Sequence, residues 1–284
     1  ADKYRVPRIC FVNKMDKIGA DFYMTLKSIK DRLNRKAVAI QLPIGAESGF
    51  SAIIDLIEMK AFNFNGDHGM QITPFDIPAD MMDDVKLYRT ELLEKVTEAS
   101  DELMGKYLSG GELTVEEIRA AIRTLVLKDE IYPVMCGSAL GNKGVQLMLD
   151  AVTYYLPAPS DVPMIVGTDP DDDETKIEVK TNDEEPFVGL AFKIATDPFV
   201  GKLAFFRVYA GKLVAGSYII NTRTGAKERV GRIVRMHANA REDVNEVYSG
   251  EIAAAIGLKN TITGDTICDE KRPVKLENIT FPEP

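Results

Sequence analysis

Residues 8–22 read R-I-C-F-V-N-K-M-D-K-I-G-A-D-F: a short apolar run, a polar loop and the start of an amphipathic segment. Short apolar runs bounded by turn residues are typical of buried strands in parallel sheets. From Asp21 to Asn34, apolar residues recur at helical spacing, and Asp21 can cap the helix. Residues 37–42 form a second apolar run, which Pro43 closes. The order strand, helix, strand predicts an α/β domain with a parallel sheet.

The α/β pattern is interrupted between about residues 45 and 130. Helical spacing fills residues 80–108 and 114–127, and the second of these starts with a capping box. A buried-strand pattern returns only at residues 131–136. We therefore predict that residues 1–156 form one α/β domain carrying an α+β insertion over about residues 45–130.

The second half of the chain has a different pattern. Residues 157–185 contain several prolines and an acidic run, which favour an extended linker. From residue 186 to about 280, short strand patterns alternate with glycine-containing turns, which predicts a closed antiparallel β-barrel. The expected strands are residues 187–195, 202–209, 218–221, 228–236, 251–256 and 265–268.

The composition is that of an ordinary globular chain with an acidic balance. Its 284 residues carry 35 basic and 44 acidic side chains, a net charge of −9, and 45% hydrophobic residues. The sequence has no run of about 18 apolar residues, so we predict no membrane helix. Its N-terminus has no apolar core, so we predict no secretion signal. The acidic balance argues against a free nucleic-acid-binding protein. We therefore expect neither a membrane nor DNA as a partner.

Cysteine and histidine are sparse. Cys10, Cys136 and Cys268 lie far apart and form no C-x-x-C motif, which indicates a reducing compartment and a cytoplasmic protein. Because the chain has only two histidines, we expect no metal site.

The residues Asn13, Lys14, Met15 and Asp16 follow the first strand, at the edge of an α/β sheet where ligands bind. A carboxylate only accepts hydrogen bonds and can accept two in parallel. Guanine presents two adjacent donors, the ring N1–H and the exocyclic amine, whereas adenine presents an acceptor at N1. Two charge-assisted bonds of roughly 1.5–3 kcal/mol each would favour guanine strongly. We therefore expect Asp16 to bind the donor edge of guanine.

The neighbours of Asp16 have roles in the same interpretation. Asn13 can bond the acceptor edge of the base or tie neighbouring loops together, and the stem of Lys14 can lie over the flat face of the base. Two alternatives remain open. The motif is a plain polar loop, or Asp16 does no more than cap the helix that follows.

A second element, Gly137-Ser138-Ala139, follows the strand predicted over residues 131–136. A parallel sheet brings the carboxyl ends of the two strands to one edge. Small residues let the backbone approach a base closely, so amide N–H groups here can donate to the guanine carbonyl oxygen.

The parts that hold and hydrolyse the phosphates are missing from the sequence. The phosphate-binding motif G-x-x-x-x-G-K-S/T does not occur, and the one D-x-x-G match, Asp16 to Gly19, already belongs to the base-reading motif. We therefore expect no catalytic residue in this chain, no GTP hydrolysis and weak binding of guanine nucleotides.

Several stretches together resemble bacterial elongation factor G, a family of translational GTPases. They are residues 13–22, 137–139, 155–157, 235–239 and 263–266. The resemblance covers the whole chain and implies an incomplete P-loop GTPase-type sheet with an inserted subdomain, then the barrel of the second domain. Residues 281–284 look like the approach to a third domain. Since the phosphate loop, both switch regions and the last three domains of the family are absent, we expect this chain to be an internal fragment.

The resemblance also implies an activity and a binding site. The family moves tRNA and mRNA on the ribosome at the expense of GTP, and the full-length protein binds GTP or GDP with Mg²⁺. By this resemblance, the residues that contact the guanine base are Asn13, Lys14, Asp16, Ser138 and Ala139.

The resemblance further implies that the insertion faces ribosomal stalk protein and that the barrel contacts small-subunit ribosomal RNA. A basic stretch in the barrel provides candidates for the RNA contact, because local basic charge can bind phosphate within an acidic protein. The four that we expect are Arg229, Arg232, Arg235 and Arg241. The alternative is that they lie on a solvated face of the sheet.

Two other functions fit the same motifs. The first is a different translational GTPase, such as a tetracycline ribosomal-protection protein or a release-factor GTPase. The second is a stand-alone RNA- or protein-binding module that never had a phosphate loop.

Overall fold

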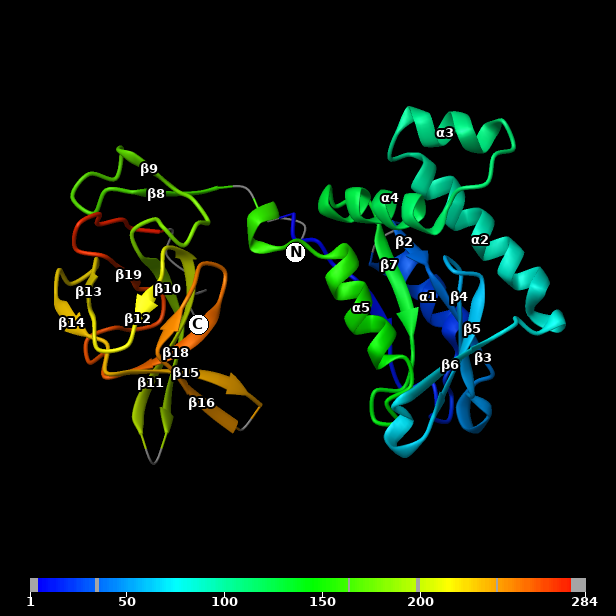
Figure 1. Cartoon of the computed structure of the whole chain (residues 1–284), viewed down its shortest axis with the longest axis horizontal. Coiled ribbons are helices and arrows are strands. Elements are labelled where there is room, and N and C mark those ends of the chain that lie inside the picture. Colours follow the sequence, from blue (N-terminus) through cyan, green and yellow to red (C-terminus); the bar gives the residue numbers. More distant parts are fainter. Residues whose placement is uncertain (1–4, 34–35, 163, 198–199, 239, 277–284) are drawn as a thin grey trace. The chain divides into compact units, whose positions relative to one another are not determined.

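The computed structural model describes residues 5–33, 36–162, 164–197, 200–238 and 240–276. The chain divides into two compact units, with the boundary between Pro157 and Ala158. The labelled α-helices belong to the first unit, and the second unit consists mainly of strands (Figure 1).

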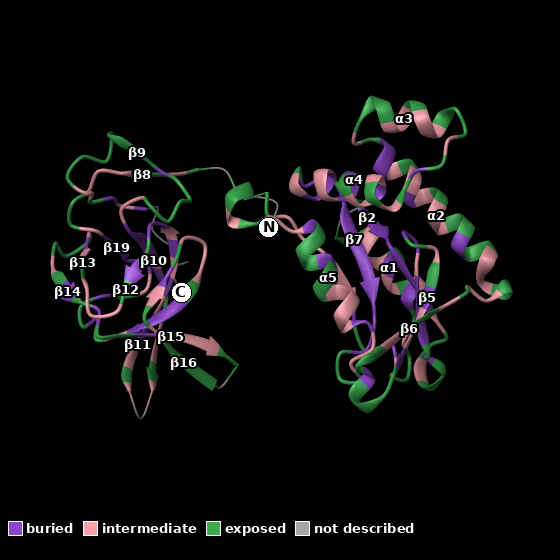
Figure 2. Ribbon diagram, in the orientation of Figure 1, coloured by how far each residue is buried: buried purple, intermediate pink, exposed green. Residues whose placement is uncertain are grey.

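The first unit begins with an α/β layer, whose elements are β1 (Cys10–Val12), α1 (Phe22–Arg32), β2 (Ala37–Ala39), β7 (Tyr132–Cys136) and α5 (Val145–Tyr155). Its three strands are parallel, in the order β1–β7–β2. β7 is buried along its whole length, as expected for the middle strand (Figure 2). The predicted α/β domain with a parallel sheet is confirmed.

An antiparallel sheet of four strands extends the first unit. It consists of β3 (Gln41–Ile44), β4 (Ala52–Asp55), β5 (Lys60–Asn65) and β6 (Gln71–Phe75), in that order. The strand predicted over residues 37–42 is therefore divided between two sheets. At Ile40, the amide donates to the Val134 carbonyl at 3.0 Å and the carbonyl accepts from the Leu56 amide at 3.0 Å. The inserted sheet thus begins at Gln41, earlier than expected, because an unbroken apolar run does not show where a strand changes partners.

Three helices complete the first unit: α2 (Met82–Thr97), α3 (Asp101–Leu108) and α4 (Val115–Leu127). α4 begins with the predicted capping box, in which Thr114 and Glu117 each bond the backbone N–H of the other. Leu92 of α2 and Ile118 of α4 are fully buried and belong to the same core as Phe22 of α1. One continuous core therefore holds the α/β layer and the inserted elements together.

The second unit is built mainly from antiparallel strands. Its large sheet has the order β14–β13–β19–β10–β11–β18–β15–β16. These strands are β10 (Val188–Asp197), β11 (Gly201–Ala210), β13 (Tyr218–Asn221), β14 (Lys227–Arg229), β15 (Arg232–His237), β16 (Ala240–Val244), β18 (Ile252–Ile256) and β19 (Thr266–Cys268).

A short pair of strands, β12 (Leu213–Val214) and β17 (Glu246–Val247), connects parts of the chain near the two edges of this sheet. β12 leads directly into β13, and β17 follows directly after β16, so the pairing closes the sheet on itself. Phe206, Ile219 and Ile233 are among the residues buried in its core. The predicted antiparallel barrel is confirmed.

The segment 157–185, expected to be an extended linker, contains a hairpin of β8 (Ile165–Thr168) and β9 (Lys176–Val179). Val179 is buried with Val274 and Leu276. Thr168 and Lys275 exchange two backbone hydrogen bonds of 2.8 Å each. The acidic run is the turn of this hairpin, because charged residues tolerate solvent there while the flanking apolar residues pack. Residues 281–284, expected to lead into a third domain, lie outside the described residues.

No helix in the described part of the chain is long and apolar enough to cross a membrane.

Candidate functional site

Two loops meet where β1 and β7 end. The last residues of these parallel strands, Val12 and Cys136, are partners in the sheet. Beyond them, the Gly137 amide donates to the Val12 carbonyl at 3.0 Å, and the Met15 amide donates to the Gly137 carbonyl at 3.1 Å. The loop of residues 13–19, called the first base loop below, is therefore bonded directly to residues 137–143, the second base loop.

Asn13 ties the two loops through its side chain. Its Oδ1 accepts hydrogen bonds from the Lys14 amide at 2.7 Å and from the Ala139 amide at 2.9 Å. The tying role expected as one possibility for Asn13 is thus present. The amide of Ser138 also has a partner, the Lys143 carbonyl at 2.9 Å. In this structure the backbone donors of Ser138 and Ala139 therefore hold the second base loop in shape.

One carboxylate oxygen of Asp16 has a polar partner, and the other has none among the described residues. Its Oδ2 lies 3.0 Å from the Lys17 ammonium nitrogen. Its Oδ1 is buried and accepts no hydrogen bond from the residues that the structure describes. The neighbouring Ser138 hydroxyl and the Lys17 ammonium hold the pKa of Asp16 below its usual value, so the group is an ionised acceptor at neutral pH. A buried acceptor without a partner is costly, and a ligand that donates hydrogen bonds would satisfy it.

The alternative that Asp16 only caps a helix is wrong. The cap of α1 is Asp21, whose side chain accepts from the Met24 amide at 2.9 Å. Asp16 lies five residues earlier, in the turn of the first base loop. Its carboxylate is thus left available to the site.

Backbone and packing constraints fix the shape of the two loops. Lys14 has a φ of 65°, in the left-handed region, and Met15 is 1% exposed, so the loop is anchored by a buried side chain between two polar ones. A Cβ at Gly137 would lie 2.5 Å from Phe11 Cζ and 2.4 Å from the Lys143 carbonyl oxygen. Only glycine therefore lets the start of the second base loop lie this close to the Phe11 ring on β1 and to the Lys143 carbonyl at the other end of the same loop.

A third segment that sequence reasoning missed also contacts both loops. It is the β3–β4 turn, residues 45–51, which bonds the first base loop through Glu47 and the second through Phe50. No sequence signal marks this contact, because its partners lie far away along the chain.

The four arginines expected to contact RNA do not form one surface. Arg232 and Arg235 lie three positions apart on β15, so their side chains leave opposite faces of the strand. Arg241 lies opposite Met236 in the β15–β16 pair and therefore shares the face of Arg232. Arg229 is exposed on β14.

Three of these arginines also have acidic partners. Arg232 lies 3.9 Å from Asp243, Arg235 lies 2.8 Å from Glu251, and Arg241 bonds the carboxylate of Asp197. Such pairing offsets part of the positive charge that would attract a phosphate backbone.

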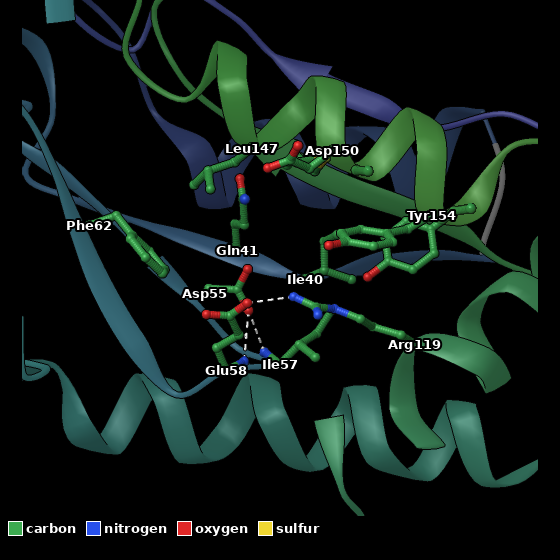
Figure 3. A pocket seen from close by; sticks show the side chains of 13 residues that line it. Ile40, Gln41, Asp55, Ile57, Glu58, Phe62, Arg119, Leu147, Asp150 and Tyr154 are labelled. Carbon is green, nitrogen blue, oxygen red and sulfur yellow. Dashed lines mark hydrogen bonds and ion pairs between the residues drawn. The ribbon is translucent and has the colours of Figure 1, made fainter. Parts of the chain in front are cut away.

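A small cavity of about 80 Å³ lies elsewhere in the first unit, and none of its lining residues belongs to the two base loops (Figure 3). Asp55 lies in its wall, where Oδ1 accepts from the amides of Ile57 at 2.7 Å and Glu58 at 2.9 Å. Arg119 bonds the Glu58 carboxylate and stacks 4.5 Å from the Tyr154 ring centre. Burial raises the pKa of Asp55 to about 6. The two hydrogen bonds to Asp55 hold the β4–β5 turn in shape.

Both units match known protein families. Residues 1–158 match the family described as the elongation factor Tu GTP-binding domain, and residues 201–268 match the one described as elongation factor Tu domain 2. Among solved structures, the chain is similar to a crystal structure of a protein from Thermus thermophilus, with a TM-score of 0.78 and 23% sequence identity. The alignment covers 99% of this chain and 39% of that one. This chain thus spans well under half the length of that protein, and the likeness is one of fold.

Proposed function

Because this chain belongs to the family of the elongation factor Tu GTP-binding domain, we propose that its two base loops bind the guanine base of GTP or GDP. The observation that carries the proposal is the Oδ1 atom of Asp16, a buried acceptor without a partner among the described residues. The ring N1–H and the exocyclic amine of guanine are adjacent donors that an ionised carboxylate accepts in parallel. Adenine, which has an acceptor at N1 beside its exocyclic amine, can donate to only one carboxylate oxygen and sets a lone pair against the other.

The proposed contacts are those expected from the sequence, with roles refined by the structure. Asp16 binds the donor edge of the base, and the exposed side chain of Lys14 covers its face. Asn13 holds the two loops at the correct separation. Ser138, whose hydroxyl lies near the Asp16 carboxylate, and Ala139 form the wall of the site.

We also propose that the whole protein is a translational GTPase of the elongation factor G type. Support comes from the resemblance of residues 13–22 and 235–239, and from the sheet and helices inserted between the two base loops. On this proposal the whole protein acts in the cytoplasm, binds GTP or GDP with Mg²⁺, and uses GTP hydrolysis to move tRNA and mRNA on the ribosome.

The present chain alone is proposed to be inactive as a GTPase. It has no phosphate-binding motif, and phosphate and magnesium contacts supply most of the catalysis in this class of enzyme. A phosphate-release assay with GTP, with and without ribosomes, tests this. We expect no release above the blank, and clear turnover would contradict the proposal.

The ribosomal contacts belong to the same proposal: the insertion with stalk protein and the barrel with small-subunit RNA. Of the four arginines, Arg229 and Arg232 are the most accessible candidates. Replacing both with glutamate should weaken binding of the chain to small ribosomal subunits and reduce its salt dependence. Unchanged binding would remove these two residues from the contact.

The base-binding proposal is tested by titrating the isotope-labelled chain with GMP and, separately, with AMP. We expect GMP to shift the amide resonances of residues 13–19 and 137–143, and AMP to leave them unchanged. Equal effects of the two nucleotides, or shifts confined to other residues, would contradict the proposal.

A further inference from the structure

The β3–β4 turn lies against both base loops and links them. On the first base loop, the Glu47 carboxylate accepts a hydrogen bond from the Gly19 amide at 2.6 Å, and the Glu47 amide donates to the Met15 carbonyl at 2.8 Å. These two bonds bracket Asp16, one on each side. The stretch that carries the proposed base-binding carboxylate is therefore pinned at both ends by a single residue of the inserted sheet.

The second base loop is held by the other end of the same turn. The Lys143 ammonium donates to the Phe50 carbonyl at 2.9 Å and lies 5.7 Å from the centre of the Phe50 ring. The backbone of Lys143 in turn pairs with Ser138 through two hydrogen bonds of 2.9 and 3.0 Å. Because Phe50 is only 2% exposed, this anchor is part of the core and does not move independently of it.

The turn itself has a defined shape. Gly45 has a φ of 79°, and a Cβ there would lie 2.1 Å from the Gly49 carbonyl oxygen. Glu47 has a φ of 54°, which is uncommon for a residue with a side chain. A strained backbone held in place by surrounding contacts is often found at functional sites. Here it presents both the amide and the carboxylate of Glu47 to the first base loop.

From these contacts we infer that Glu47 is a positioning residue for guanine binding: it holds Asp16 in the orientation that accepts the donor edge of the base. The inference rests on the proposed function of the two base loops. It makes the inserted sheet part of the base site, since a displacement of the β3–β4 turn would be transmitted to Asp16. The Glu47 carboxylate acts through the Gly19 amide and touches no ligand itself.

The test compares three substitutions at Glu47 in the full chain, with GMP as the probe. Glu47→Ala and Glu47→Gly both remove the carboxylate, and glycine tolerates the positive φ, so it separates side-chain loss from backbone strain. Glu47→Gln keeps an acceptor oxygen for the Gly19 amide. Glu116→Ala, at an exposed position on α4, is the matched control.

We expect the alanine and glycine variants to weaken GMP binding about three- to tenfold, because a hydrogen bond to a charged acceptor is lost. Glu47→Gln should retain most of the affinity, and Glu116→Ala all of it. Amide hydrogen exchange at Gly19 should become faster in the alanine and glycine variants only. A loss of GMP affinity with an unchanged Tm in the alanine and glycine variants would separate a positioning role from mere support of the fold.

Two negative results are distinguishable. If the wild-type chain shows no GMP-specific shifts, the proposed function fails and the inference fails with it. If the wild-type chain binds GMP and the alanine and glycine variants bind equally well, Glu47 has no positioning role while the base site stands.

Discussion

The side-chain oxygen of Asn13 lies 2.9 Å from the amide nitrogen of Ala139, a residue 126 positions further along the chain. The same oxygen also accepts from the Lys14 amide. One side chain thus joins two loops that the inserted sheet and helices separate in sequence. The proposed guanine site depends on this junction, since Asp16 belongs to one of the joined loops and Ser138 to the other.

Asn13→Ala should separate the loops. It removes the acceptor of the Lys14 and Ala139 amides; both bonds are exposed, so water can replace the acceptor, and each lost bond should cost about 0.5–1.5 kcal/mol. We expect faster hydrogen exchange at these two amides, a lower Tm of the first unit and loss of GMP-induced shifts. Asn65→Ala, at an exposed position on β5, is the control. Unchanged exchange at Ala139 would show that Asn13 does not hold the loops together.

Gly137→Ala should destabilise the first unit by about 1–3 kcal/mol through overpacking. The new methyl group would lie 2.5 Å from the ring of Phe11 and 2.4 Å from the Lys143 carbonyl oxygen. Gly105→Ala is the matched control, because a Cβ there meets nothing within 4 Å and alanine favours the α3 helix. Urea unfolding of the two variants should give changes of opposite sign. A neutral effect of Gly137→Ala would mean that the second base loop can shift away from Phe11 at little cost.

Asp55→Asn should stabilise the first unit at neutral pH. Burial raises the pKa of Asp55 from 3.8 to about 6, so the folded state disfavours its charged form. Below pH 3.8, Asp55 is protonated in both the folded and the unfolded state, so it does not reduce the free energy of unfolding. As the pH rises through about 6, the buried group ionises and the free energy of unfolding falls. The loss is up to about 3 kcal/mol. Asparagine keeps an acceptor for the Ile57 and Glu58 amides but does not ionise.

Urea unfolding at about pH 4.5 and about pH 7.5 checks this prediction. The advantage of Asp55→Asn over the wild type should be larger at the higher pH. An equal difference at the two values would mean that Asp55 ionises normally in the folded protein.

Asp265→Ala should destabilise the barrel. Its carboxylate accepts hydrogen bonds from Arg223 at 2.6 and 3.0 Å, from the Asn221 amide group at 2.7 Å and from the Ile262 amide at 2.8 Å. Asn221 is fully buried, and leaving its side chain without this partner costs about 1–3 kcal/mol. Asp243→Ala, which removes an exposed carboxylate of the same unit, is the control. Equal thermal unfolding of the two variants would contradict the assignment.

Protonation of the Asp265 carboxylate should destabilise the barrel in acid. Burial tends to raise the pKa of Asp265, but the hydrogen bonds from Arg223, Ile262 and Asn221 outweigh it and hold the pKa below its ordinary value of 3.8. The contribution of Asp265 to stability is therefore complete at neutral pH and is lost only as the pH falls through this lowered value. Asp265→Asn should accordingly lose its difference from the wild type in strong acid.

Much of this fold can be predicted from local patterns. The apolar run before Asn13, the cap at Asp21 and the capping box at Thr114 are local signals, and the structure contains all of them. The order of strand, helix and strand patterns was enough to predict the parallel sheet, and the short strand patterns separated by glycine-containing turns in the second half of the chain were enough to predict the barrel.

The missed features depend on contacts between distant residues. The chain passes from one sheet to the other at Ile40, inside one apolar run. The acidic turn of the hairpin β8–β9 favoured the prediction of a linker instead of two strands. For the site, the predicted residues Asn13, Asp16, Ser138 and Ala139 are brought together by parallel pairing of β1 and β7. Glu47 could not be identified, since a glutamate in a turn has no local pattern that reveals its bond to Gly19.

The central claim is that Asp16 reads the donor edge of guanine, and a change of base preference tests it most directly. Asparagine at position 16 presents one donor and one acceptor, which match the C2 carbonyl and N1–H of xanthine. Titration of the wild-type chain and of Asp16→Asn with GMP and XMP should show that the wild type prefers GMP and the variant prefers XMP. An unchanged preference for GMP in Asp16→Asn would contradict the account.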